Sequence, residues 1–599
     1  MQERALRDLI ENVRGGGLPR RRFIQRLVGL GLTAPMASML LMHEGIAQTT
    51  SALPYKPTRR GGGTVRIIYP DAAMHLNPHL TSGNKERVVS RIFYEPLAGW
   101  DNDGHLVPQL AAEIPSRDNG GLAADGKSVI WKLKRDVQWH DGKPFTADDV
   151  VFTAAYAADP AAAMYTSFIY KDIQVEKIDT HTVRVRYPVA VPFWAEALVA
   201  SLGMILPRHV FEPFKGARAR ENPAHFKPVG TGPYRIVDFK PGDGLRAEAF
   251  AQYHVPHQPF FDALELKGGG DATNAARTVL QTGDFDIVWG LRVEDDILQR
   301  LSASGKGRVS YQRGGDVDFI VLNASDPWTE VDGERGSARS RHPAFSDKAV
   351  RTAMSLLVDR QGIQEVVYGR SAVATANFLN GLARYSSPHT AFEFNIDKAN
   401  QVLEAAGWKR GADGTRAKAG PNGPVKLKFV CQAPSGGQAQ KCQTVLKSAC
   451  SKAGIELELK VVVTSVFFGG DAANPDTYQK FWADLQVYGN TMQQPDPQGH
   501  MERFTSGRIP QKANKWAYNN TPRWSNAEYD AIFKASQTEL DPVKRAAMFI
   551  RMNDLLVGDG YLIPLVARAR VEATANKLVP MPSVWDSPSW AIGSWYREA

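Results

Sequence analysis

Residues that could take part in catalysis occur throughout this chain of 599 residues, but they do not form a complete catalytic motif. Residues 121–128 read Gly-Leu-Ala-Ala-Asp-Gly-Lys-Ser, which is the spelling of a phosphate-binding loop. The apolar run at 129–133 predicts a strand there, whereas a helix N-terminus would be needed to hold the phosphate. Neither the nucleophile elbow G-x-S-x-G nor the dinucleotide fingerprint G-x-G-x-x-G occurs. The sequence therefore predicts that the protein is not an enzyme.

Two histidine pairs have the spacing of metal ligands, but the backbone around them is unsuitable. His75 and His79 are four residues apart, and Asn77-Pro78 between them disfavours the helix that would direct both rings at one metal. His254 and His257 lie on either side of a proline in a predicted loop, and we expect both at the surface. We expect no bound metal and no cofactor.

Three cysteines are too few for a disulfide scaffold, and the distribution of charge does not indicate a nucleic-acid-binding protein. Cys442 and Cys450 are eight residues apart on one predicted helix, so their Cα atoms lie about 12 Å apart, too far for a disulfide. A Cys431–Cys442 disulfide is geometrically open, but three buried free thiols are the preferred interpretation. The net charge of +9 comes from basic residues that are scattered along the chain. A nucleic-acid surface would concentrate them, so we expect no nucleic-acid binding.

The N-terminal region has the three parts of a secretory signal. Arg20, Arg21 and Phe23 precede an uncharged apolar run at 27–42, and small residues follow up to Ala47. Paired arginines before this run are typical of the twin-arginine type, which exports folded proteins. We expect cleavage after Ala47, a tether at 48–62, and a soluble periplasmic protein.

Hydrophobic periodicity in the rest of the chain predicts an α/β protein. Strands are expected at 64–69, 129–133, 285–289, 425–430, 455–463 and 562–567. Helices are expected at 150–158 (capped by Thr146), 272–282, 347–358, 399–406 and 439–453, and two more within 527–556, divided at Asp541-Pro542. Single strands that alternate with helices predict parallel sheets in open α/β units.

Five separated stretches resemble one family when they are taken together in order. They are 76–83 (LNPHLTSG), 131–150 (WKLKRDVQWHDGKPFTADDV), 228–234 (PVGTGPY), 345–351 (FSDKAVR) with Asp359-Arg360, and 403–408 (LEAAGW). Their order and spacing resemble the extracytoplasmic solute-binding proteins of family 5, the peptide, oligopeptide and nickel type that serves ABC importers. We expect these motifs to form turns and helix starts of the scaffold and not to contact the ligand.

The resemblance implies a two-lobed α/β fold of the type II periplasmic-binding-protein class, cluster C, with an extra subdomain. Lobe one is expected at 63–310 with the subdomain at about 91–204, lobe two at 311–556, and a return to lobe one at 557–599. The expected function is the capture of a peptide or peptide-like solute by hinge closure and its delivery to membrane permease subunits. The alternatives are a non-peptide solute (a sugar, an opine-like conjugate or a nickel chelate) and an exported hydrolase. A monomer is the usual state of this family.

The sequence departs from the peptide-binding members of the family at the ligand anchors. In those members an aspartate three residues before an Asp-Pro pair holds the ligand's ammonium group. Asp496-Pro497 fits the pair, but Gln493 stands at the anchor position. The arginine that holds a dipeptide's carboxylate is absent between Cys431 and Cys450.

The candidate ligand contacts follow from the entry loop and from the end of lobe two. Hydroxyl groups and bare backbone at a cleft mouth suit polar solutes, and the lobe-two residues offer stacking, charge and a hydroxyl group. The candidates are Thr81, Ser82, Gly83, Trp482, Asp484 and Tyr488. Asp484 is the expected replacement for the missing ammonium anchor, whereas Trp289 is expected in the core.

Overall fold

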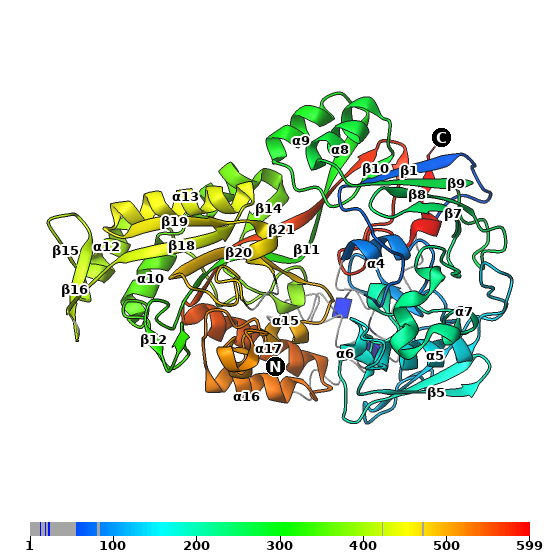
Figure 1. Cartoon of the computed structure of the whole chain (residues 1–599), viewed down its shortest axis with the longest axis horizontal. Helices are drawn as coiled ribbons and strands as arrows, with labels where there is room; N and C mark the ends of the chain where they lie inside the picture. The colour runs from blue at the N-terminus through cyan, green and yellow to red at the C-terminus, as the bar shows by residue number, and fades with distance from the viewer. Residues whose placement is uncertain are drawn as a thin grey trace.

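Two halves of one continuous β-sheet form the framework of the protein (Figure 1). The computed structural model describes residues 55–80, 84–421, 423–469 and 473–598, together with residues 12, 13, 18, 22 and 23. Of the predicted signal residues, Phe23 is described and buried. Arg20, Arg21 and Ala47 lie outside the described residues, and so do Thr81, Ser82 and Gly83.

Eleven strands of the described residues belong to this sheet. From one edge to the other they are β19 (Glu456–Val462), β18 (Lys428–Pro434), β20 (Leu485–Met492), β11 (Gly307–Leu322), β21 (Leu562–Ala575), β10 (Ile287–Val288), β1 (Thr64–Tyr69), β9 (Ala263–Gly268), β8 (Gly244–Ala249) and β7 (Tyr234–Lys240), with β14 (Ala372–Ala374) paired to β21. We call the half that contains β1 and β7–β10 lobe one, and the half that contains β18–β20 lobe two.

The expectation of purely parallel sheets is wrong. β1 runs parallel to β9 and β10, and β18 runs parallel to β19 and β20. β11 pairs antiparallel with both β20 and β21, and β21 pairs antiparallel with β10. The strands that join the two lobes therefore reverse direction and make the sheet mixed.

β11 and β21 cross from one lobe to the other. They contain 16 and 14 residues, respectively, and pair along most of their length. The sequence predicts only 562–567 for β21, because charged residues follow the apolar run; in the structure these charged residues continue the strand. The pairing shifts register between Arg313 and Asp316, where Gly314 and Gly315 form an irregularity in β11. A Cβ atom on Gly315 would lie 2.4 Å from the Cβ atom of Met492, so the close approach of β20 requires glycine there.

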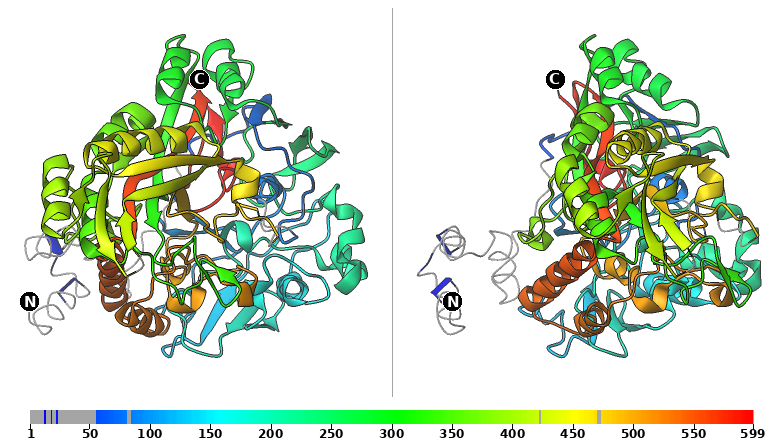
Figure 2. Two further views of the ribbon diagram at one scale, coloured as in Figure 1. Left: turned by 60° about the vertical axis from the view of Figure 1, so that its left-hand side comes forward. Right: turned by 90° about the vertical axis from the view of Figure 1, so that its left-hand side faces the viewer.

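Helices cover lobe two as the apolar periodicity predicts. α10 (Lys348–Leu356), α12 (Ile396–Ala405), α13 (Gly437–Lys452), α16 (Ala527–Ser536) and α17 (Pro542–Gly558) lie within a few residues of their predicted ranges. α16 and α17 lie together below strands β18–β20 in both figures (Figures 1 and 2). Asp541 caps α17 by accepting hydrogen bonds from the amides of Val543 and Lys544, which explains the break between the two helices.

Two other local expectations have different outcomes. The strand predicted at 425–430 is wrong as a single element, because it divides at Leu427 into β17 (Gly423–Lys426) and β18. β17 belongs to a small separate sheet, whereas β18 belongs to the main one.

All three cysteines are free and buried, which agrees with the preferred interpretation of the sequence. None of the helices in the described part of the chain combines the length and apolar character needed to cross a membrane.

A separate three-stranded sheet and one capped helix lie within residues 128–186. β4 (Ser128–Lys132) and β5 (Gln174–Asp179) flank β6 (Thr182–Arg186). Residues 121–127 contain an isolated β-bridge at Leu122 and then a turn before β4, so the phosphate-loop spelling has no helix behind it. α5 (Ala147–Ala158) begins with a capping box, in which Thr146 accepts from Asp148 N and Asp149 accepts from Thr146 N.

Candidate functional site

A cavity of about 380 Å³ lies between the two lobes, and we call it the interlobe cavity. Its lining includes Tyr69, Asp71, Asn84, Arg87, Trp100, Glu196 and 289–292 from lobe one, Asp316 and 568–572 from the crossing strands, Thr491, Gln493 and Gln494 from lobe two, and 585–588 near the C-terminus. Its volume lies within the usual range for small-molecule sites. Because both lobes and both crossing strands contribute to it, relative movement of the lobes would open or close it.

Charged residues of β21 form one wall of the interlobe cavity. Arg568, Arg570 and Glu572 are spaced by two along the strand, so their side chains share a face. The Arg570 guanidinium donates to the carbonyl oxygens of Ser583 at 2.8 Å, Val584 at 3.0 Å and Asp586 at 3.1 Å. Arg570 therefore fixes the C-terminal segment against the strand.

The second arginine of this wall is neutralised by two aspartates of β11. Nε of Arg568 lies 2.8 Å from an Asp318 carboxylate oxygen, and Nη2 lies 3.7 Å from Asp316. Asp318 also accepts a hydrogen bond from the Tyr368 hydroxyl at 2.6 Å. This ion-pair network ties β11 to β21 at the point where they pass between the lobes.

Glu572 is a buried carboxyl group of the same wall. Burial raises its pKa to about 7, although the nearby Arg570 charge and a hydrogen bond from Gln312 act in the opposite direction. At neutral pH this group therefore exists in both protonation states and can either donate or accept a hydrogen bond.

Several polar atoms of the lining have no hydrogen-bond partner among the described residues. They are the indole Nε1 atoms of Trp289 and Trp585 and the Oδ2 atom of Asp586. All three side chains are buried, and Asp586 Oδ2 forms an ion pair with Arg91 Nη2 at 3.6 Å. Buried polar groups of folded proteins are nearly always paired, so the two indole N–H groups stand out as donors without a partner among the described residues. Trp289 is buried, as expected for a core residue, but it also borders the cavity.

One hydrogen bond crosses the interlobe cavity from lobe to lobe. Gln494 Nε2 donates to Glu196 Oε1 at 2.8 Å. Burial raises the pKa of the Glu196 carboxyl group, and the hydrogen bond from Gln494 opposes this effect. Gln493, at the position of the peptide ammonium anchor, also lines the cavity.

The lobe-two residues predicted as ligand contacts do not line this cavity. The Trp482 indole donates to the Arg335 carbonyl oxygen at 3.2 Å, and the cationic groups of Arg335 and Lys480 lie 5.0 and 4.9 Å from the centroid of its ring. The Tyr488 hydroxyl is buried and lies 2.7 Å from Thr521 Oγ1. On the other side of the cavity, Asn84 and Arg87 of α4 (Asn84–Ser90) directly follow the predicted contacts at 81–83.

Asp484 lies in a buried network of hydrogen bonds. Its Oδ1 accepts from Trp328 Nε1 at 2.9 Å and His342 Nε2 at 3.0 Å, and its Oδ2 accepts from Val430 N at 2.7 Å. His342 Nδ1 accepts from the amides of Ala344 and Phe345, which places the imidazole proton on Nε2. This carboxylate therefore holds three distant segments of lobe two together.

We expect Asp484→Asn to lower the free energy of unfolding by about 2 kcal/mol, because an amide cannot accept all three hydrogen bonds. Urea denaturation measures this change. Asp413→Asn, an exposed carboxylate of the same lobe with one lysine partner, is the control and should change little. Unchanged stability together with a tenfold loss of solute affinity would contradict the structural role and assign Asp484 to the ligand.

The Asp-Pro pair of the family motif also stabilises lobe two. Both Asp496 carboxylate oxygens accept from the Arg545 guanidinium, and both side chains are almost fully buried.

The residues of the interlobe cavity that sequence reasoning missed are chiefly those of β21. The alternation of Arg568, Arg570 and Glu572 directly after an apolar run was the available signal, because it predicts a strand with one charged face.

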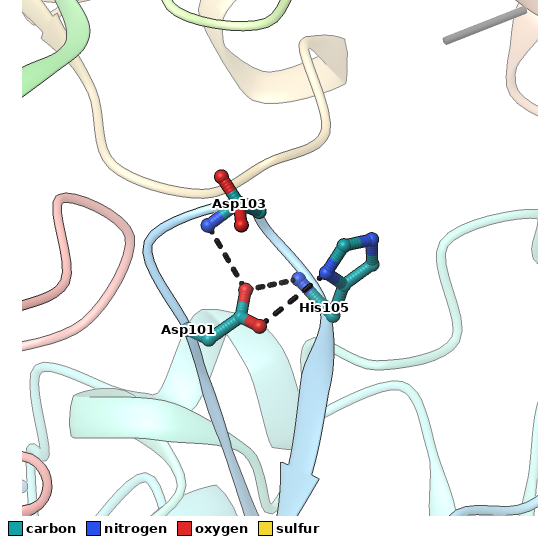
Figure 3. Close-up of side chains that lie close together, drawn as sticks. All are labelled: Asp101, Asp103 and His105. Carbon is teal, nitrogen blue, oxygen red and sulfur yellow. Dashed lines mark hydrogen bonds and ion pairs between the residues drawn. The ribbon is translucent and has the colours of Figure 1, made fainter. Parts of the chain in front are cut away.

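A cluster of possible metal ligands lies outside the cavity, at the turn of 101–105 (Figure 3). Asp101 Oδ1 accepts from the amides of Asp103 at 3.0 Å and His105 at 2.8 Å, and His105 Nδ1 lies 3.3 Å from Oδ2. Asp101 thus organises the turn that the sequence predicts at this position. These contacts explain the cluster without a metal.

The remaining histidine predictions have mixed outcomes. His79 is buried, with Nδ1 near Thr166 Oγ1 and Nε2 near the Met204 carbonyl oxygen, so both ring nitrogens are occupied. His257 is exposed, as expected. The surface expectation for His254 is wrong, because its side chain is only 5% exposed and pairs with Glu95 at 2.9 Å. Sequence could not indicate this partner, which lies 159 residues away.

Comparison with known proteins gives consistent results. The family model of bacterial extracellular solute-binding proteins, family 5 Middle, matches residues 105–511. The oligopeptide-binding protein AppA of Bacillus subtilis is 27% identical over 463 residues, covering 76% of each chain. The solved substrate-binding protein CtaP of Listeria monocytogenes (TM-score 0.71, 20% identity) covers 90% of this chain and 100% of its own. NikZ of Campylobacter jejuni, solved with Ni(L-His), has a TM-score of 0.69 and 20% identity, with 89% and 99% coverage. The chain therefore belongs to family 5 of the bacterial extracellular solute-binding proteins.

Proposed function

We propose that this protein captures a peptide or peptide-like solute in the interlobe cavity by hinge closure and delivers it to the permease of an ABC importer. The observation that carries the proposal is the cavity itself, which is lined from both lobes and from both crossing strands. Closure around a ligand is a common use of two lobes joined by a few crossing segments. Membership of family 5 supports the same role.

The charges at the cavity suit a solute that carries both signs. Arg292 is exposed at the lining and forms no hydrogen bond or ion pair with another described residue, so its guanidinium group can donate hydrogen bonds to a carboxylate of the solute. Glu572 and Glu196 offer carboxyl groups for an ammonium group. Thr81, Ser82 and Gly83 are proposed as further contacts, because the chain enters the cavity lining directly after them at Asn84.

A solute other than a peptide is the second candidate. Gln493 lines the cavity in place of the carboxylate that anchors a peptide's ammonium group in the family. The names of the similar proteins include both an oligopeptide-binding protein and a protein solved with Ni(L-His), so the scaffold accepts more than one solute class. An opine-like conjugate, a sugar or a nickel chelate would each need different groups at Gln493 and Glu572.

The setting of this activity is proposed from the sequence. Residues 1–47 act as a twin-arginine signal that is cleaved after Ala47, and the monomeric protein works in the periplasm without catalysing a reaction. The lobe boundaries at 63–310, 311–556 and 557–599 form part of the same proposal. N-terminal sequencing of the exported protein tests the cleavage site, and light scattering tests the monomer.

Native mass spectrometry of the exported protein, purified without refolding, tests the function. A discrete mass that is released on denaturation identifies the solute, and a peptide mass supports the leading candidate. An opine, sugar or nickel-chelate mass supports the second candidate. Absence of any adduct, together with small-angle scattering profiles that no solute class changes, would contradict the binding role. Turnover of ester, amide or glycoside substrates would instead identify a hydrolase.

We expect Gln494→Ala to weaken solute binding about fivefold, because the closed form loses about 1 kcal/mol of lobe-to-lobe hydrogen bonding. Isothermal titration calorimetry with the released solute measures the change. Gln361→Ala, an exposed glutamine of lobe two, is the control. An unchanged dissociation constant in Gln494→Ala would show that the contact with Glu196 does not contribute to closure.

A further inference from the structure

A second cavity of about 310 Å³ lies within lobe one, and we call it the lobe-one pocket. It shares no lining residue with the interlobe cavity. Its walls are largely apolar and include Val107, Pro108, Val255, Trp590 and Ile592. The scaffold motifs and the proposed import function leave this pocket without a role.

Three polar side chains form a buried group at this pocket. The Tyr253 hydroxyl and His254 Nε2 each lie 2.9 Å from a different oxygen of the Glu95 carboxylate. Glu95 and His254 side chains are each only 5% exposed. Because both carboxylate oxygens are occupied, Glu95 has a limited capacity to accept further donors.

The same pocket contains one cationic donor that these contacts leave unused. Lys134 is half-buried, and its ammonium group forms no hydrogen bond or ion pair with another described residue. Burial lowers the pKa of Lys134, although the Glu95 charge opposes this effect. His254 Nδ1 is buried and has no hydrogen-bond partner in the described part of the chain, and it is an acceptor in the neutral ring whose Nε2 donates to Glu95. The partly desolvated ammonium group of Lys134 is costly unless an acceptor is supplied.

We propose that the lobe-one pocket binds a small organic carboxylate with an apolar body, its carboxylate on Lys134 and its body against the apolar wall. The chemical class of this ligand follows from the residues that line the lobe-one pocket. The unpaired ammonium group of Lys134 favours an anionic acceptor, and the apolar surface around it favours an aromatic or short branched group. A fully polar anion such as phosphate would leave that surface without a partner.

Calorimetric titration of the exported protein with benzoate tests this proposal, with benzyl alcohol as the uncharged probe. We expect benzoate to bind, and Lys134→Met to weaken its binding at least tenfold, because a buried carboxylate then lacks its partner. Lys132→Met is the matched control, since Lys132 ends β4 two residues before Lys134 but pairs with Glu113 at the surface. Lys134→Met removes an unpaired cation, so we expect it to fold as stably as the wild type.

Val255→Trp is the second variant, and it fills the pocket without changing a charge. It should abolish benzoate binding while retention of the interlobe solute is unchanged. Three results would each overturn the proposal: no binding at about 10 mM benzoate, equal affinity for benzoate and benzyl alcohol, or equal benzoate affinity in Lys134→Met and wild type. These results do not depend on whether the interlobe cavity binds a solute, so the two proposals can fail separately.

Discussion

Replacement of Arg545 by methionine is expected to lower the free energy of unfolding by about 3–5 kcal/mol, because it leaves the buried Asp496 carboxylate without its cation. The guanidinium contacts both oxygens of Asp496, and it also donates to the Ser536 carbonyl at 2.9 Å and to Gln498 at 2.8 Å. The side chains of Arg545 and Asp496 are 7% and 6% exposed, so water cannot replace the lost contacts. Urea denaturation followed by circular dichroism measures the effect.

Arg551→Met is the matched control for this experiment. Arg551 lies on the same helix, α17, and pairs with Glu528 at 2.7 Å, but both side chains are about half exposed. Exposed ion pairs contribute less than about 1 kcal/mol, so we expect the control to remain close to the wild type. Equal losses in the two variants would show that helix propensity, and not the buried ion pair, sets the stability of this region.

The second large effect is a pH dependence that originates from Glu572. Its pKa rises from an ordinary value of 4.5 to about 7 on folding. Between these values the folded protein holds a proton that the unfolded chain has lost, so stability falls as pH rises from about 4.5 to 7 and is constant above. Glu572→Gln mimics the protonated form. Above pH 7 we expect this variant to be more stable than the wild type by about 3 kcal/mol.

Thermal or urea unfolding of both proteins from pH 4.5 to 8 isolates this contribution. Buried histidines such as His79 and His140, whose pKa values burial lowers to about 4, change stability in the opposite direction and are common to both proteins. Glu265→Gln, an exposed carboxyl group in lobe one, serves as the control and should leave the profile unchanged. Parallel pH profiles for wild type and Glu572→Gln would mean that Glu572 remains ionised in the folded protein.

Local sequence signals were sufficient for most elements of the fold. Thr146 and the aspartates after it predicted the start of α5, and Asp541-Pro542 predicted the division between α16 and α17, because caps and breaks depend on near neighbours. The extent of β21 was not predictable from hydrophobicity. Arg568, Arg570 and Glu572 face a polar cavity, and such a strand lacks the continuous apolar run of a buried one.

The candidate site was less accessible to sequence reasoning. Asp484 was chosen as a charged residue near the end of lobe two, but its neighbours Trp328 and His342 come from more than 140 residues away. Whether a carboxylate faces a ligand or a ring of donors is decided by such distant contacts. The same applies to His254 and Glu95. Gln493 was identified by its place three residues before Asp496-Pro497, and it lines the interlobe cavity.

The position of β21 in the sheet has a consequence for the order in which the chain is made. β21 lies between β11 and β10, so the sheet is completed by the strand that leaves the ribosome last among its members. Strands β1, β9 and β10 emerge hundreds of residues before β21, and β10 can pair with β21 only after β21 has emerged. A nascent chain stopped before residue 562 would lack the link between the two halves of the sheet. The sheet is thus completed only once residues 562–575 have emerged from the ribosome.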